Sequence, residues 1–200
     1  MIEFRDLTEQ EIDCRVQSSG EQKNKDTLWA RVLLYKDARV DMNLLDEVIG
    51  QENWQRDHKE LKGNMYCGIG INVNYTDKTK EPLWVWKWDC GAESMTDKEK
   101  GESSDSFKRS AVCWGLGREL YTKIPIMIYG LPKNDKGKVA GNFVVEKIKI
   151  ENKEITALSL MFKANGSDDY LRCFVWTKQD GVKLCNYNLP TTNGISYKGN

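Results

Sequence analysis

The sequence predicts an α+β protein, in which helices and antiparallel strands occupy successive stretches of one chain of 200 residues. Three observations support this class. Apolar residues recur with the period of a helix in residues 41–50 and in residues 105–120. They alternate with polar residues or glycine, as in half-buried strands, in residues 65–73 and 83–91. Three more strand-like runs follow, in residues 143–150, 155–162 and 170–177.

The composition is that of a globular protein without net charge. Apolar residues make up 40% of the chain, and 30 Lys and Arg are balanced by 30 Asp and Glu. Because no overall field attracts polyanions, any site for them must be local. The N-terminal residues lack the apolar region of a secretory signal, and no stretch reaches the roughly 18 apolar residues of a membrane span. We therefore expect a cytoplasmic protein with no membrane partner.

Residues 1–27 are expected to form an N-terminal helix and a loop. Thr8 and Glu11 have the spacing of a capping box, and Ile12 and Val16 lie one helical turn apart. Residues 18–26 are polar and contain a glycine, which predicts the loop.

A helix and a strand hairpin follow. Residues 41–50 predict an amphipathic helix that ends at Gly50 as its C-cap, with an apolar side formed by Met42, Leu45, Val48 and Ile49. The two alternating stretches then form a hairpin, whose turn in residues 76–82 carries Lys78 and Lys80. Its second strand places three indoles on one face, those of Trp84, Trp86 and Trp88. Such a stripe is more often core or subunit contact than a platform for stacked bases, and one helix does not readily cover it, so we expect a homo-oligomer.

The second helix is predicted to begin after an N-cap at Ser104 or Asp105. Its apolar residues cover almost the whole circumference, yet Lys108 and Arg109 stand in its first turn. A helix N-terminus carries partial positive charge, which disfavours cations there unless a phosphate binds. The alternative is a solvated basic pair balanced by Asp105 and Glu102.

Residues 54–63 hold another basic cluster that includes Arg56, His58 and Lys59, and it fits either a solvated strand or the wall of a groove.

Residues 131–190 are predicted to form a C-terminal β-meander, and residues 191–200 a polar, flexible tail.

Sites for common cofactors are missing from the sequence. The glycines near residue 137 lack the spacing of a phosphate loop, and two G-x-G stretches lack the third glycine of a dinucleotide site. The six cysteines form no C-x-x-C, and His58 is the single histidine, so we expect reduced thiols and no metal. We expect no cofactor and no enzyme, although a small enzyme with a dispersed site stays an alternative.

Residues 30–122 resemble the phage single-strand annealing proteins of the Sak type, viral relatives of the eukaryotic Rad fifty-two recombination mediators. The resemblance rests on an ordered set: "LLYKDARVDMNLLDEVIGQENWQRDH", then a hairpin with glycines, then "SSDSFKRSAVCWGLGREL". It implies that residues 28–130 form a β-β-β-α annealing core, built from a helix, an antiparallel hairpin sheet and a long helix. It also implies a ring or filament that anneals single-stranded DNA without ATP, located in the host cytoplasm if the protein is viral.

The resemblance assigns DNA contacts residue by residue. The arginine that opens the first core helix matches Arg39, and the basic pair of the second matches Lys108 and Arg109. Where eukaryotic members often carry another arginine one turn on, this chain has Val112. The remaining candidates for DNA contact are Arg56, Lys59, Lys78 and Lys80. A single-strand-binding protein is a further candidate partner, and a non-catalytic oligomeric scaffold is the alternative function.

Overall fold

In the computed structural model, residues 2–91, 98–121 and 124–185 are described. The chain forms two compact units, and each is assembled from two separate stretches. Unit 1 contains residues 1–6 and 37–118, and unit 2 contains residues 7–36 and 119–200. The consecutive segments expected from the sequence, 1–27, 28–130 and 131–190, did not anticipate this interleaving. The tail predicted for residues 191–200 lies outside the described residues.

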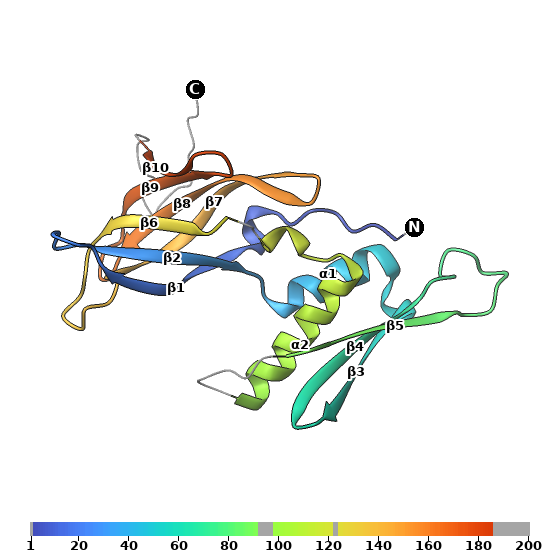
Figure 1. The fold of residues 1–200 in the computed structure, drawn as a ribbon. Helices are drawn as coiled ribbons and strands as arrows, with labels where there is room; N and C mark the ends of the chain where they lie inside the picture. The colour runs from blue at the N-terminus through green and yellow to red at the C-terminus, as the bar shows by residue number, and fades with distance from the viewer. Residues whose placement is uncertain (1, 92–97, 122–123, 186–200) are drawn as a thin grey trace. The chain divides into compact units, whose positions relative to one another are not determined.

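Unit 1 is a three-stranded antiparallel sheet with two helices (Figure 1). Its strands lie in the order β3-β4-β5. The elements are α1 (Ala38–Ile49), β3 (Trp54–Leu61), β4 (Asn64–Asn72), β5 (Trp84–Cys90) and α2 (Lys98–Trp114), with a 3₁₀ turn η2 (Gln51–Asn53) after α1. The predicted first helix and hairpin are therefore confirmed, and residues 54–61 supply a third strand.

Helix α1 ends before Gly50 as predicted, but it begins at Ala38, three residues before the predicted stretch 41–50. The Asp37 side chain accepts a hydrogen bond of 2.7 Å from the backbone N–H of Arg39, which caps the first turn. Gly50 ends the helix with a φ of 85°, a conformation that costs glycine little. Leu44, Leu45 and Ile49 are buried on its apolar side.

The register of the strands assigns every side chain of the sheet to one of two faces. Ile69 of β4 lies opposite Arg56 of β3 and Lys87 of β5, and these three share the face that α2 covers. Gly68 lies opposite Asp57 and Trp88, which point to the other face. The three indoles of β5 thus lie on the face away from the helix.

Helix α2 begins at Lys98, so the predicted start after Ser104 or Asp105 is wrong. Residues 98–104 carry no apolar periodicity, which is why the serines and Asp105 resembled a cap. Tertiary contacts favour the longer helix, since Glu102 accepts a hydrogen bond of 2.6 Å from the backbone N–H of Met65. Lys108 and Arg109 consequently lie in the interior of the helix, far from its N-terminal N–H groups.

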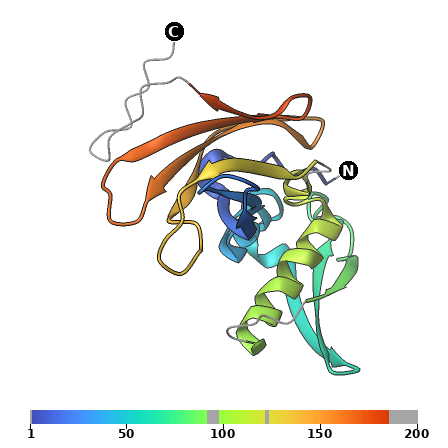
Figure 2. The same cartoon turned by 60° about the vertical axis from the view of Figure 1, so that its left-hand side comes forward.

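Unit 2 consists of two antiparallel sheets, with strand orders β1-β2-β6 and β10-β9-β8-β7. The two sheets meet where β1 approaches β7 and β6 approaches β10. Figure 2 shows the yellow strand β6 next to the orange and red strands of the second sheet. Its elements are η1 (Glu9–Glu11), β1 (Asp13–Glu21), β2 (Leu28–Tyr35), β6 (Ile126–Leu131), β7 (Gly141–Glu151), β8 (Glu154–Ala164), β9 (Tyr170–Thr177) and β10 (Gly181–Cys185). A further 3₁₀ turn, η3 (Arg118–Leu120), spans the junction of the units in the sequence. The predicted meander is confirmed as β7, β8 and β9, and β10 extends it.

The predicted N-terminal helix is wrong. The capping contact does form, with 2.8 Å between the Thr8 N–H and the Glu11 carboxylate, but it supports only one 3₁₀ turn. From Asp13 the chain pairs with β2 as strand β1, which also takes up residues 18–21 of the expected loop. Pairing with the apolar β2 outweighs the weak local preference for a helix. Among the described helices of the chain, none is long and apolar enough to cross a membrane.

Candidate functional site

The inner face of α2 is held to the sheet by hydrogen bonds to strand carbonyls. Ser110 Oγ donates to the carbonyl oxygen of Lys87 at 2.8 Å, and Trp114 Nε1 donates to that of Ile69 at 2.9 Å. Ser103 Oγ lies 3.2 Å from His58 Nε2 near the other end of the helix. These contacts fix which side chains of α2 face the sheet and which point away from it.

Arg56 lies beside α2 on the β3 side of the covered face. Its guanidinium carbon is 5.5 Å from the ring centroid of Phe107, and Phe107 packs at 6.4 Å from Trp54. The Arg56 side chain is exposed, and no carboxylate pairs with it in the described part of the chain. Its charge is therefore available to a ligand.

Arg109 lies on the β5 side of α2, and its charge is balanced. Its Nε is 3.4 Å from Asp89 Oδ1, with the Arg109 side chain 44% exposed and the Asp89 side chain 30%. Cys113 Sγ, one turn on, lies 3.9 Å from Asp89 Oδ2. Burial, and secondarily the charge of Asp89, raises the pKa of the Cys113 thiol.

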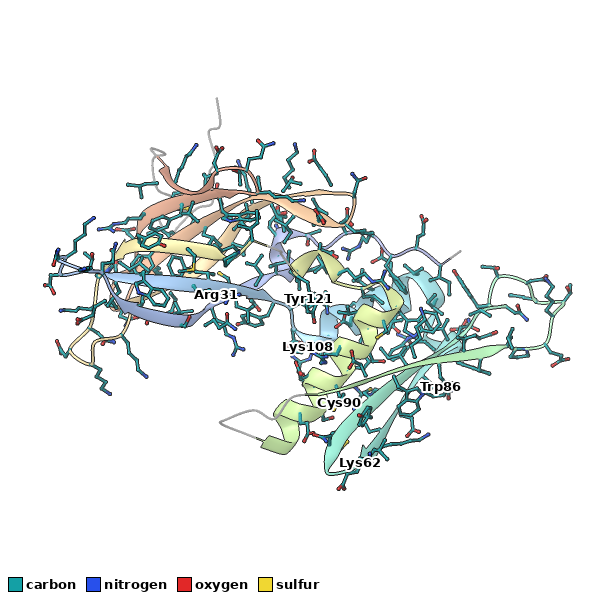
Figure 3. The ribbon with its side chains drawn as sticks, in the orientation of Figure 1. Arg31, Lys62, Trp86, Cys90, Lys108 and Tyr121 are labelled. Atoms are coloured by element: carbon teal, nitrogen blue, oxygen red, sulfur yellow. The ribbon has the colours of Figure 1, made fainter. Side chains whose placement is uncertain are left out.

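Lys108 points away from the sheet, on the opposite side of α2 from Trp86 (Figure 3). It is half-buried and has no ion-pair partner among the described residues. The adjacent cations Lys108 and Arg109 therefore diverge. Of the two carboxylates expected to balance the pair, Asp105 and Glu102, the second accepts a hydrogen bond from the N–H of Met65.

Two cations that the sequence reading did not select bind the C-terminal end of α2. Lys87 Nζ donates to the carbonyl oxygen of Cys113 at 3.0 Å and lies 4.2 Å from the ring centroid of Trp114. Arg118 donates through Nε to the carbonyl of Val112 at 2.9 Å and through Nη2 to that of Cys113 at 3.2 Å. Cations stabilise this negative end of the helix dipole. Lys87 could have been selected from the sequence, because side chains alternate along a strand and Lys87 stands between Trp86 and Trp88, on the opposite face from the indoles.

Arg39 lies in the first turn of α1, as expected. Its side chain is exposed and has no carboxylate partner in the residues that the structure describes. Helices α1 and α2 contact each other. Arg39, Arg56 and Lys108 are thus carried by elements on the helix-bearing side of the sheet, and their charges are not balanced within the described chain.

The other predicted contacts lie elsewhere in unit 1. Lys59 is on the outer face of β3, where it pairs with Asp57 at 3.5 Å. Lys78 and Lys80 are exposed in the β4–β5 connection, and Lys80 Nζ lies 3.1 Å from Asp77. Hydrogen bonds from Thr79 and Lys80 lower the pKa of Asp77, so this pair persists at neutral pH.

No metal site is found in the part of the chain that the structure describes. No group of three His, Cys, Asp or Glu side chains among residues 2–91, 98–121 and 124–185 could hold a metal ion. The five cysteines whose state is described are free thiols.

The comparison with protein-family models matches residues 4–128 to the model described as "Rad52/22 family double-strand break repair protein". This range includes every described helix and strand of unit 1, together with β1 and β2. Neither the curated proteins nor the solved structures contain a match to the chain. Because the family model spans more than half of the 200 residues, the chain belongs to the Rad52/22 family of double-strand break repair proteins.

Proposed function

We propose that this chain binds single-stranded DNA and anneals complementary strands without ATP, as a homo-oligomeric ring or filament of the phage Sak type. The observation that carries the proposal is the family match over residues 4–128, which takes in all of β3, β4, β5 and α2. We assign these four elements as the β-β-β-α annealing core.

The charges on the helix-bearing side support a backbone contact with DNA. Arg39, Arg56 and Lys108 come from three different elements and have no carboxylate partner in the described chain. Cations that bind phosphates hold a strand in place without reading its sequence, which is what an annealing protein needs. An arginine adds a bidentate geometry for phosphate that lysine lacks.

The phosphate contact proposed here differs in kind from one at a helix N-terminus. Lys108 and Arg109 lie inside α2, so their side chains alone are available to phosphate. Lys108 can bind phosphate directly. Arg109 must first exchange Asp89 for a phosphate oxygen, or act by holding α2 against β5.

The open edges of the sheet support assembly into an oligomer. In the described chain β3 and β5 each pair with β4 on one side only, so each has an unpaired edge. Such edges can join strands of a neighbouring copy. A repeated subunit then aligns a few cations per copy into a continuous track for DNA.

The test is annealing of complementary oligonucleotides without ATP or divalent ions, combined with light scattering and electron microscopy of the same sample. We expect annealing well above the spontaneous rate and particles far larger than the 23.0 kDa chain. An oligomer without salt-dependent affinity for single-stranded DNA would instead identify a scaffold. Turnover of a substrate would identify an enzyme.

A further inference from the structure

We infer that Trp86 and Trp88, on the outer face of the β3-β4-β5 sheet, form a platform on which two nucleobases of the bound strand stack. This inference rests on the proposed binding of single-stranded DNA, and it adds base contacts on the face opposite α2. Figure 3 shows Trp86 on the side of the sheet away from α2.

The two indoles lie flat against the sheet, because glycines stand beneath them. A Cβ at Gly68 would come within 2.5 Å of the Trp88 ring, and one at Gly70 within 2.6 Å of the Trp86 ring. In each case three ring atoms are nearly equidistant from that position, as expected for a ring that covers the backbone. One π-face of each indole thus packs on β4, and the opposite π-face points outward from the half-buried ring.

The two rings together offer a nearly continuous surface. Their centroids are 5.7 Å apart and their planes differ by 23°. This separation exceeds the 3.4 Å rise per nucleotide of a stacked strand, so a strand with one base on each ring must be extended. Stacking uses the faces of the bases and leaves their pairing edges free for a complement.

A cation lies over one ring of the platform, on the π-face that points away from β4. Lys59 Nζ lies 4.3 Å from the Trp88 ring centroid. It also lies 3.5 Å from Asp57 Oδ2, and both side chains of this ion pair are exposed. Exposed pairs of this kind contribute little, so the ammonium group can exchange its carboxylate for a phosphate. A base that stacks on Trp88 would therefore displace the ammonium group from the ring face, and the ammonium group could then bind the phosphate of the same nucleotide.

The composition of the outer face favours a nucleic acid over a second copy of this chain. Along β3 this face carries Gln55, Asp57 and Lys59, whereas the centre of a subunit interface is depleted of charge. The unpaired edges of β3 and β5 provide a contact between copies that leaves the indoles uncovered.

The test compares two oligonucleotides with equal numbers of phosphates, oligothymidylate and an abasic strand, on three variants of the full chain. The wild type should prefer oligothymidylate by about 5- to 150-fold for each stacked base. In the double variant Trp86→Leu with Trp88→Leu this preference should disappear, while affinity for the abasic strand is retained. Trp86→Phe with Trp88→Phe should keep part of the preference, because phenyl rings also stack. Tyr129→Leu removes an exposed ring from β6 of unit 2 and should behave as wild type.

The outcomes separate this inference from the function on which it rests. If the wild type binds neither strand, the proposed function fails and the platform with it. If the wild type and the Leu variant show the same preference, the platform alone is refuted. A smaller particle for the Leu variant in light scattering would make the indoles a subunit contact and also refute it. If the Leu variant does not fold, photo-crosslinking of the wild type to an iodouracil-substituted strand tests the platform instead. Crosslinks at Trp86 or Trp88 would support the platform, and crosslinks only at other residues would refute it.

Discussion

Arg109 on α2 and Asp89 on β5 form an ion pair, with 3.4 Å between Nε and Oδ1, whereas the preceding Lys108 has no such partner in the described chain. Two adjacent cations that look equivalent in the sequence therefore do different work. Arg109 ties the helix to the edge strand, and the charge of Lys108 is not balanced by a carboxylate within the described chain.

Lys108→Ala should weaken the binding of single-stranded DNA without unfolding the protein, because its side chain points away from the sheet. One charge-assisted phosphate contact per subunit corresponds to about a tenfold loss of affinity, or roughly 1.4 kcal/mol. Fluorescence anisotropy with a labelled oligonucleotide measures it. Lys80→Ala is the matched control, since Lys80 is already paired with Asp77, and equal losses in both variants would place the groove elsewhere.

Arg109→Ala should lower the free energy of unfolding by about 0.5–1 kcal/mol, because it leaves Asp89 without this partner at a partly exposed site. Urea denaturation followed by circular dichroism measures the change. Replacing Asp89 by Asn in the same chain should recover part of the loss, since no unpaired carboxylate is left. If Arg109→Ala changes DNA affinity as much as Lys108→Ala and leaves stability unchanged, Arg109 is a phosphate ligand instead.

The affinity for single-stranded DNA should fall with salt in proportion to the number of unbalanced cations. If Arg39, Arg56 and Lys108 each neutralise one phosphate, the log–log salt slope is about −2 per subunit, at roughly −0.7 per contact. Lys108→Ala should reduce it to about −1.4. Titrations at several salt concentrations with two unrelated sequences give the slope. An affinity that ignores salt, or that depends on one sequence, would falsify binding through the backbone.

Gly68→Ala should destabilise the sheet, because the new methyl group would stand 2.5 Å from the Trp88 ring. Forcing the indole off the strand costs about 1–3 kcal/mol by analogy with overpacked cores. The same substitution in a Trp88→Leu background should cost clearly less, since the flat ring is gone. If the two substitutions lower the free energy of unfolding additively in this double-mutant cycle, the Trp88 ring is not what requires a glycine at position 68.

Buried thiols should make the protein less stable at high pH. Burial raises the pKa of Cys67 from 9.0 to about 11 and that of Cys14 to about 12. The thiols of the unfolded chain ionise first, so the free energy of unfolding should fall as pH rises from about 9 through these values. Iodoacetamide alkylation of the native protein at pH 8, read by mass spectrometry, should leave the buried Cys67 unmodified and label the half-buried Cys14 more slowly than in urea. Labelling of either thiol at the rate found in urea would contradict the burial.

Much of unit 1 could be predicted from the sequence because its signals are local. Asp37 and Gly50 cap α1 through their own side-chain and backbone preferences, and strict alternation specifies β4 and β5. The parity that places Lys87 opposite to the indoles follows from the period of a strand. Lys108 and Arg109 were also selected from the sequence, but they were placed in the first turn of the helix and not in its interior, where the structure has them.

Elements that depend on a distant partner could not be predicted in the same way. Residues 13–21 become strand β1 because β2 pairs with them, although their local pattern allows a helix. Residues 98–104 continue α2 towards its N-terminus because Glu102 finds the N–H of Met65, which is 37 residues away in the chain.

The sequence by itself determined the α+β class, the hairpin, the meander and the identity of the basic residues, since each depends on periods and caps within a short window. Only the tertiary structure decided which of these cations is unbalanced, because Asp89 on β5 pairs with Arg109 on α2, and these two residues are 20 positions apart in the chain. It also decided how α2 is held on the apolar face of β4. Ser110 and Trp114 donate hydrogen bonds to carbonyl oxygens of β5 and β4, and these contacts between distant segments are encoded by no local pattern.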